Sequence, residues 1–175
     1  MVRRADNTPD VNSEPSPSDF RIVKQRTDAV VTLSGGLTTQ GCFFIAGGSA
    51  RHTGPERVGD LLNSESGFFP FEIHSVGRAH TVLYNRNQVV MVALGGDEAR
   101  GDPGYDVATQ RFVSVLLSNG QRIVGAVRVY RPEGRDRLSD WARQPEPFRY
   151  FETADGMTLI VNVAHIIEVN EVTQS

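Results

Sequence analysis

The chain has 175 residues, of which 39% are hydrophobic and 22% are charged, and its formal net charge at pH 7 is −3. This composition is typical of a globular protein, and the length accommodates one domain or two small ones. The slightly acidic balance of charge argues against a global attraction to nucleic acid or to an anionic membrane. No stretch approaches the roughly 18 consecutive apolar residues that a membrane helix needs, so we expect no membrane insertion.

Residues 1–19 predict a disordered tail, because their Pro, Ser, Asn and Asp content cannot pack a hydrophobic core. The basic residues of this segment are not followed by an apolar run, so we do not expect a secretory signal. Cys42 is the only cysteine and lies in an apolar run, which predicts a buried thiol and excludes an intrachain disulfide. That cysteine usage and the strong preference for arginine over lysine indicate a bacterial, cytoplasmic protein.

Residues 20–94 predict a small unit of short strands with one helix. Apolar and polar residues alternate over 29–35 ("AVVTLSG"), which predicts a strand that ends at a glycine turn, and a second strand begins at Gly41. Residues 57–63 ("RVGDLLN") space their apolar side chains three or four apart, as one face of a short helix requires. The unit is completed by strands and a tight Asn-containing turn in two segments: 68–72 ("FFPFE") and 81–92 ("TVLYNRNQVVMV").

The second half of the chain repeats the first. Residues 95–110 are Gly-rich, acidic and aperiodic, which predicts a flexible surface linker. Beyond it, 115–125 ("VLLSNGQRIVG") aligns without a gap with 31–41 ("VTLSGGLTTQG"), and the two copies extend over about 28–94 and 111–172. We interpret the chain as a tandem duplication. The matching pairs include Gly41 with Gly125, Arg57 with Arg137, Asp60 with Asp140, Phe68 with Phe148, Glu72 with Glu152, Thr81 with Thr158 and Asn85 with Asn162.

Residues that both copies keep are expected to shape the unit. We expect Gly41 and Gly125 at sharply bent positions, where a side chain would meet neighbouring backbone. The arginine and aspartate of each Arg-x-x-Asp motif lie three residues apart and can tie the helix to its loop or to the sheet. A ligand-binding arginine is the alternative. The motif residues are Arg57 and Asp60 in the first copy and Arg137 and Asp140 in the second. Glu72 and Glu152, after the aromatic strands, are also shared and carry the same two interpretations.

Units of about 60 residues with this many short strands close most easily into small barrels. Residues 113–130 ("VSVLLSNGQRIVGAVRVY") resemble the first motif of the Sm/Lsm family, which has Hfq-like bacterial members, and residues 159–169 ("LIVNVAHIIEV") resemble the second. Small SH3-like barrels share the pattern, and the Arg-x-x-Asp-Leu-Leu-Asn segment also resembles uncharacterised bacterial domains. The resemblance implies a mainly β fold of two tandem small Sm-like or SH3-like barrels, 20–94 and 111–175, each with a short helix inserted between strands.

In the Sm family, aromatic, basic and histidine residues line an RNA pocket at the turn of the second motif, and this chain does not match that set. Tyr84 and Arg86 in the first copy can stack on and neutralise a nucleotide, whereas the second copy offers Asn162 and His165. Arginines and aromatic residues interleave between 128 and 150, which suits either nucleic acid or a protein interface. Because the first copy is acidic, protein partners are favoured. These candidates are Arg128, Tyr130, Arg131, Trp141 and Tyr150.

Assembly is the other implication of the family resemblance, since Sm-type rings form when the fourth strand of one unit pairs with the fifth strand of the next. The last strands of both copies carry little charge and are poorly defended as free edges. We therefore expect the two units to pair with each other through these strands. One free edge of each kind then remains, which favours either further head-to-tail association or a blocking helix from 137–143 ("RLSDWAR"). The aromatic residues of the second copy offer an anchor, so a homo-oligomer is preferred.

The sequence contains no P-loop, dinucleotide fingerprint, nucleophile elbow or His-Glu-x-x-His motif. Its four histidines lack the spacing of metal ligands. We therefore expect no catalytic residue, no metal and no cofactor. The sequence predicts a non-enzymatic interaction or assembly module that binds protein partners or a second copy of itself, with RNA binding of the Sm type as the alternative.

Overall fold

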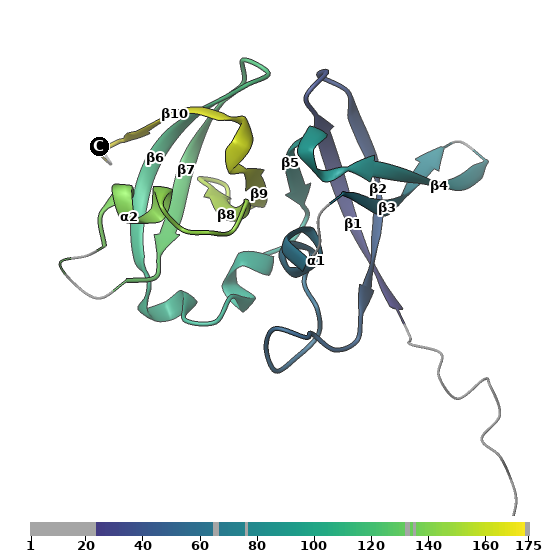
Figure 1. Cartoon of the computed structure of the whole chain (residues 1–175), viewed down its shortest axis with the longest axis horizontal. Helices are drawn as coiled ribbons and strands as arrows, with labels where there is room; N and C mark the ends of the chain where they lie inside the picture. Colours follow the sequence, from purple (N-terminus) through teal and green to yellow (C-terminus); the bar gives the residue numbers. More distant parts are fainter. Residues whose placement is uncertain (1–23, 65–66, 76, 132–133, 135, 174–175) are drawn as a thin grey trace, which may run out of the picture.

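The structure is a computed structural model that describes residues 24–64, 67–75, 77–131, 134 and 136–173. The expected tail, residues 1–19, lies outside the described residues. The described chain is mainly β, with ten antiparallel strands in one open sheet and few helices (Figure 1). Among these described segments, no helix has the length and apolar character needed to cross a bilayer.

The elements follow one another in the same order in both halves of the chain. The first half holds β1 (Lys24–Leu33), β2 (Thr38–Ala46), α1 (Val58–Ser64), β3 (Phe68–Ser75), β4 (Arg78–Asn85), η2 (Arg86–Gln88) and β5 (Val89–Leu94). The connecting segment holds η3 (Glu98–Gly101) and η4 (Tyr105–Val107). The second half holds β6 (Thr109–Leu117), β7 (Arg122–Val129), α2 (Leu138–Ala142), β8 (Phe148–Thr153), β9 (Thr158–Asn162), η5 (Val163–His165) and β10 (Ile166–Glu171).

The strands lie in the sheet in the order β10-β6-β7-β8-β9-β5-β1-β2-β3-β4. The first unit (β1 to β5) and the second unit (β6 to β10) therefore share one internal strand order. The units are joined where β5 pairs with β9, with Met91 opposite Val161 and Leu94 opposite Thr158. This is the pairing between units that the duplication predicts. It leaves β4 and β10 as the two edges of the sheet, at opposite ends of the molecule in Figure 1.

Two equivalent glycines allow neighbouring strands to approach closely. A Cβ atom at Gly41 would lie 2.0 Å from the carbonyl oxygen of Glu72, and one at Gly125 would lie 2.1 Å from that of Glu152. Real Cβ atoms do not approach backbone so closely, so neither position accepts a side chain without movement of the strands. The glycines lie on β2 and β7, where these strands pair with β3 and β8.

Each unit has its own hydrophobic core, and each core includes at least one side chain from a strand of the other unit. The first core contains Phe43 and Phe69, whose ring centroids lie 5.4 Å apart, and the second contains Trp141. Ile160 of β9 joins the first core, and Val90 of β5 joins the second. The junction between β5 and β9 is therefore packed by apolar side chains as well as hydrogen-bonded.

The helices α1 and α2 lie where the apolar spacing predicts them, and each begins at an Arg-x-x-Asp motif. Asp60 Oδ2 accepts the backbone N–H of Arg57 at 3.0 Å, and Asp140 Oδ2 accepts that of Arg137 at 3.1 Å. This is half of a capping box, which satisfies an N–H group at the start of a helix. The side chain of Arg57 is largely buried whereas Arg137 is exposed. The capping contact is thus what the two copies share.

The segment between the units is folded against both of them, unlike the flexible linker that its composition predicts. Ala99 of η3 is buried, and the carboxylate of Asp102 accepts a hydrogen bond from Arg57 Nη1 at 2.7 Å. The carboxylate of Glu98 accepts one from the Tyr150 hydroxyl at 2.9 Å. Glu98 and Asp102, two of the acidic residues of the linker, therefore serve as acceptors at the contact between the units.

Candidate functional site

Strand β4, one free edge of the sheet, exposes apolar side chains whose counterparts in the second unit are buried. Leu83 of β4 is 66% exposed, whereas its repeat counterpart Ile160 of β9 is 0% exposed. Phe68 of the adjacent β3 is 60% exposed, whereas its counterpart Phe148 is 4% exposed and lies in the first core. The difference in exposure follows from the order of strands in the sheet. Strand β9 pairs with β5 of the other unit, whereas β4 is the last strand of the sheet.

Strand β10, the other free edge, shows the same relationship. Ile167 is 64% exposed, and its counterpart Val90 on β5 is 0% exposed and lies in the second core. Large exposed apolar side chains are unremarkable singly, but three of them lie here at positions that the repeat buries elsewhere. The β4 edge thus exposes the counterparts of residues that β8 and β9 bury at the junction, and the β10 edge exposes the counterpart of a residue that β5 buries there.

Polar side chains complete the internal junction. Asn63 of α1 donates to the carbonyl oxygen of Phe148 at 2.8 Å and accepts the backbone N–H of Phe148 at 3.0 Å. Asn162 is buried, and its amide donates to the carbonyl oxygen of Val89 at 2.9 Å. Its side-chain oxygen accepts the N–H of Ala164, and Asn85 makes the same turn contact with Asn87 in the first unit. Asn162 is therefore a turn and junction residue, not a free contact for a nucleotide.

The two edges differ in charge. Strand β4 carries Arg78 and His80 and no acidic residue, whereas β10 carries Glu168 and Glu171 and no basic residue. Glu168 accepts a hydrogen bond from Arg122 at 3.1 Å, in a pair whose side chains are nearly half exposed. This difference in charge favours pairing of β4 with β10 over pairing of two β4 edges or of two β10 edges.

Arg86, predicted as an RNA contact beside Tyr84, lies in the interior. Its guanidinium donates to the carbonyl oxygen of Phe68 at 2.7 Å and to that of Leu61, near the end of α1, at 3.1 Å. The hydroxyl of Tyr84 donates to Thr39 Oγ1 at 3.2 Å, and the ring is half-buried. The charge of Arg86 is therefore committed to holding the helix against the sheet, and it is not available to a phosphate in this structure.

Arg149 performs the same task in the second unit from a different position in the sequence. It is buried, and its guanidinium donates to the backbone carbonyl oxygens of Trp141 in α2 and of Gln144 and Glu146 in the loop that follows it. Its charge also lies 4.9 Å from the ring centroid of Trp141. Burial lowers the pKa of the Arg149 guanidinium from its usual value. Sequence comparison of the copies missed this residue, because the first copy has a phenylalanine at its position.

The arginine and aromatic candidates of the second copy converge on one cleft. The cleft has a volume of about 440 Å³ and lies between α1, the connecting segment and the second unit. Arg128 is paired with Glu152 at 3.1 Å, so this cation is already neutralised. Burial raises the pKa of the Tyr150 hydroxyl far above its ordinary value. The predicted residues that line the cleft are Arg128, Tyr130, Arg131, Trp141 and Tyr150.

The wall of the cleft beside α1 contains a charged network around Asp60. His52 Nε2 lies 2.7 Å from Asp60 Oδ2, and Arg57 Nε lies 3.2 Å from the same oxygen. Burial by itself raises the pKa of the Asp60 carboxyl, but the hydrogen bonds from His52 and Arg57 outweigh burial and the pKa lies below its ordinary value. Arg57 also binds Asp102, so this shared arginine joins the helix to the connecting segment.

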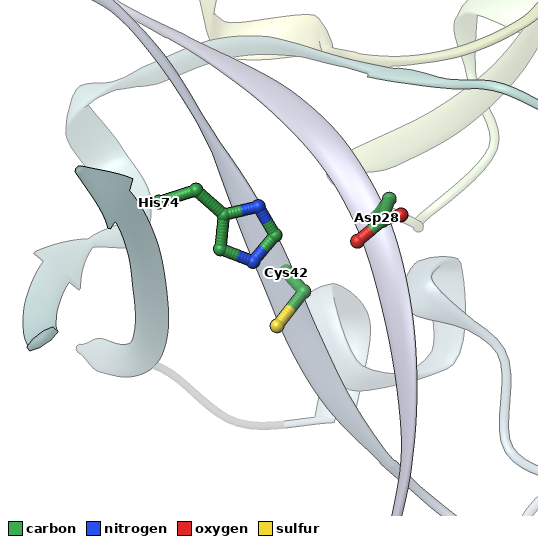
Figure 2. A group of neighbouring side chains, drawn as sticks. All are labelled: Asp28, Cys42 and His74. Carbon is green, nitrogen blue, oxygen red and sulfur yellow. The ribbon is translucent and has the colours of Figure 1, made fainter. Parts of the chain in front are cut away.

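A group of potential metal ligands lies elsewhere, on the first unit. Asp28 of β1, Cys42 of β2 and His74 of β3 bring a carboxylate oxygen, a thiol sulfur and an imidazole nitrogen within 4.8 Å of one another (Figure 2). Spacing along the chain does not reveal this group, because its members come from three strands that are adjacent only in the sheet. The histidine pattern had predicted no metal site.

No protein-family model matches the chain, and neither a curated protein nor a solved structure is significantly similar to it.

Proposed function

We propose that the protein is a non-enzymatic assembly module, built from two repeated small open barrels of the Sm-like type, that joins further copies of itself edge to edge. Strand β10 of one copy pairs with strand β4 of the next, as β5 pairs with β9 inside the chain. The observation that supports this proposal is the exposure of Phe68, Leu83 and Ile167, whose counterparts in the repeat are all buried at the internal junction.

The internal junction supplies the register of the proposed pairing. Transfer of the β5–β9 pairs through the repeat places Val169 of one copy opposite Leu83 of the next. Val90 is the counterpart of Ile167 and packs in the core of the unit that carries β9. The same arrangement between copies would place Ile167 in the core of the unit that carries the neighbouring β4. The full set of transferred pairs is Glu168 with Tyr84, Val169 with Leu83, Asn170 with Val82 and Glu171 with Thr81.

The energetics favour reversible assembly. Burial of three large apolar side chains contributes about 5–9 kcal/mol at roughly 1.5–3 kcal/mol each. The loss of translational and rotational freedom on association costs roughly 4–15 kcal/mol. The favourable free energy of apolar burial and of the added strand hydrogen bonds is therefore similar in size to this cost. The degree of assembly is therefore expected to depend on protein concentration. Since the two edges differ, the contact is head-to-tail and gives a ring or an open chain.

Light scattering of the purified full chain over a hundredfold range of concentration tests the proposal. We expect a mass that rises above 19.2 kDa, the mass of one chain. Leu83→Asp and Ile167→Asp each place a charge at the proposed contact and should abolish the rise. Leu37→Asp alters an equally exposed residue in a turn outside both edges and should not. A mass of one chain at every concentration would contradict the proposal.

A further inference from the structure

The outward face of the first unit also offers a cation site. We propose that Asp28, Cys42 and His74 bind one zinc ion through a carboxylate, a thiolate and an imidazole, with a fourth coordination position open to water or to another ligand. This inference concerns a different face from the sheet edges and does not depend on self-assembly.

The sheet itself brings the three side chains to one face. Asp28 is directly opposite Cys42 in the pairing of β1 with β2, and Cys42 is directly opposite Glu72 in the pairing of β2 with β3. His74 lies two residues beyond Glu72, and residues two apart in a strand point to the same side. In Figure 2 the imidazole of His74 extends across β2 toward Cys42 and Asp28.

The donor atoms suit zinc in type and in spacing. Zinc binds thiolate at about 2.3 Å, imidazole at about 2.0–2.1 Å and carboxylate at about 2.0–2.2 Å, so donors around one tetrahedral ion lie roughly 3.5 Å apart. The donor atoms here lie within 4.8 Å of one another. We expect rotation of the side chains to close that difference.

The second unit supplies an internal control for the group. Its strands pair in the same way, with Phe112 opposite Ala126 and Ala126 opposite Glu152. The fold therefore accepts apolar residues at these positions, and stability of the unit does not require polar ones. Asp28, Cys42 and His74 correspond to Phe112, Ala126 and Ala154 in the second unit, so none of the three donors is repeated. The neighbouring shared residues, the glycines at 41 and 125 and the glutamates at 72 and 152, are the same in both units.

The surroundings allow a cation to enter and be held. Cys42 is buried, while Asp28 and His74 are exposed beside it, so the thiol is reached past the other two ligands. The thiol also lies 3.8 Å from the carboxylate of Glu72, which forms an ion pair with Arg26. The carboxylates of Asp28 and Glu72 therefore both lie near the sulfur, and only that of Glu72 is paired with Arg26 among the described contacts. Zinc binding would release the proton of the Cys42 thiol. The negative charge of the resulting buried thiolate would then be balanced by the bound cation.

Titration of the full chain with zinc chloride against a chromophoric chelator, and with cobalt(II) as a spectroscopic probe, tests the site. We expect one ion per chain and a thiolate-to-cobalt charge-transfer band. Cys42→Ala should abolish the band, and His74→Ala and Asp28→Asn should each weaken binding by more than the roughly 10–100-fold that loss of an outer-shell partner costs. Because the second unit has alanine at the positions of Cys42 and His74, these variants should fold.

His80→Ala, on the neighbouring strand β4 and outside the group, is the matched control and should leave affinity and spectrum unchanged. Circular dichroism of every variant checks folding independently of the metal. The proposal is overturned if the wild-type chain gives no charge-transfer band, or if removal of all three ligands leaves zinc affinity unchanged. The mass measured by light scattering in the absence of zinc is a separate result and does not bear on this one.

Discussion

Ile167 and Val90 occupy the same position in the two copies of the unit, yet Val90 lies in a core and Ile167 lies in solvent. The two strands that carry them have the same neighbour on one side, the first strand of their own unit. They differ on the other side, where β5 meets β9 and β10 ends the sheet. Burial of an isoleucine side chain contributes about 1.5–3 kcal/mol relative to its exposure. The isolated chain lacks this stabilisation at Ile167.

Edge complementation follows from this asymmetry. Leu83→Asp spoils the β4 edge and leaves β10 intact, whereas Ile167→Asp does the reverse. Each variant alone should remain a single chain, and an equimolar mixture should form a dimer and nothing larger. Size-exclusion chromatography with light scattering measures both. A mixture that stays monomeric under conditions where the wild-type chain assembles would contradict the pairing of β4 with β10.

The register of the contact can be tested by cross-linking. In a Cys42→Ala background, Leu83→Cys with Val169→Cys places two thiols directly opposite each other between copies, within the reach of a disulfide. Oxidation should give covalent oligomers on a non-reducing gel. Thr81→Cys with Val169→Cys displaces one partner by two residues and should cross-link far less. Equal cross-linking of the two pairs would rule out the transferred register.

Gly125→Ala should lower the free energy of unfolding by about 3 kcal/mol, as violations of a closely packed backbone do. The added Cβ would meet the carbonyl oxygen of Glu152, so strands β7 and β8 must separate. Gly41→Ala should behave similarly. Gly48→Ala adds a Cβ where nothing lies within 4 Å and serves as the control. Urea unfolding measures all three, and an unchanged midpoint for Gly125→Ala would show that the close approach has no structural importance.

Arg86→Met and Arg149→Met should each destabilise the chain by about 1–3 kcal/mol or more, because buried carbonyl oxygens at the end of a helix lose their donor. Arg100→Met, at a largely exposed site, should change stability little. Thermal unfolding provides the comparison. A titration with short RNA distinguishes the two interpretations of Arg86, since an RNA contact predicts lost affinity with unchanged stability.

Asp60→Asn should reduce stability at neutral pH by roughly 1.5–3 kcal/mol, the usual contribution of hydrogen bonds to a charged group. The folded-state pKa of Asp60 is below its ordinary value, so the carboxylate stabilises the fold at neutral pH. That contribution is present above the unfolded-state pKa and is lost as pH falls through the lower, folded-state pKa. The difference between the wild-type chain and the variant should therefore shrink below about pH 4. Urea unfolding from pH 7 to pH 3 measures it, and a difference independent of pH would exclude the charge as its cause.

Local pattern and internal repetition were sufficient to predict much of the fold. Alternation predicted the strands, apolar spacing predicted the helices at 57–63 and 137–143, and the matching asparagines predicted the turns before β5 and β10. The duplication also predicted that a last strand of one unit would pair with the other unit. Each of these properties depends on residues close in sequence or on comparison of the two copies.

Only the tertiary structure decided which side chains are free. Arg86 looked like an exposed cation, but the end of α1 accepts its hydrogen bonds. The acidic connecting segment looked solvated, but Asp102 lies against Arg57. Cys42 and His74 have no motif in common, and three adjacent strands bring them together with Asp28. The physical reason is the same in every case: strand register and packing join residues distant in sequence, and no local pattern encodes which partner will lie within hydrogen-bonding or ligand distance.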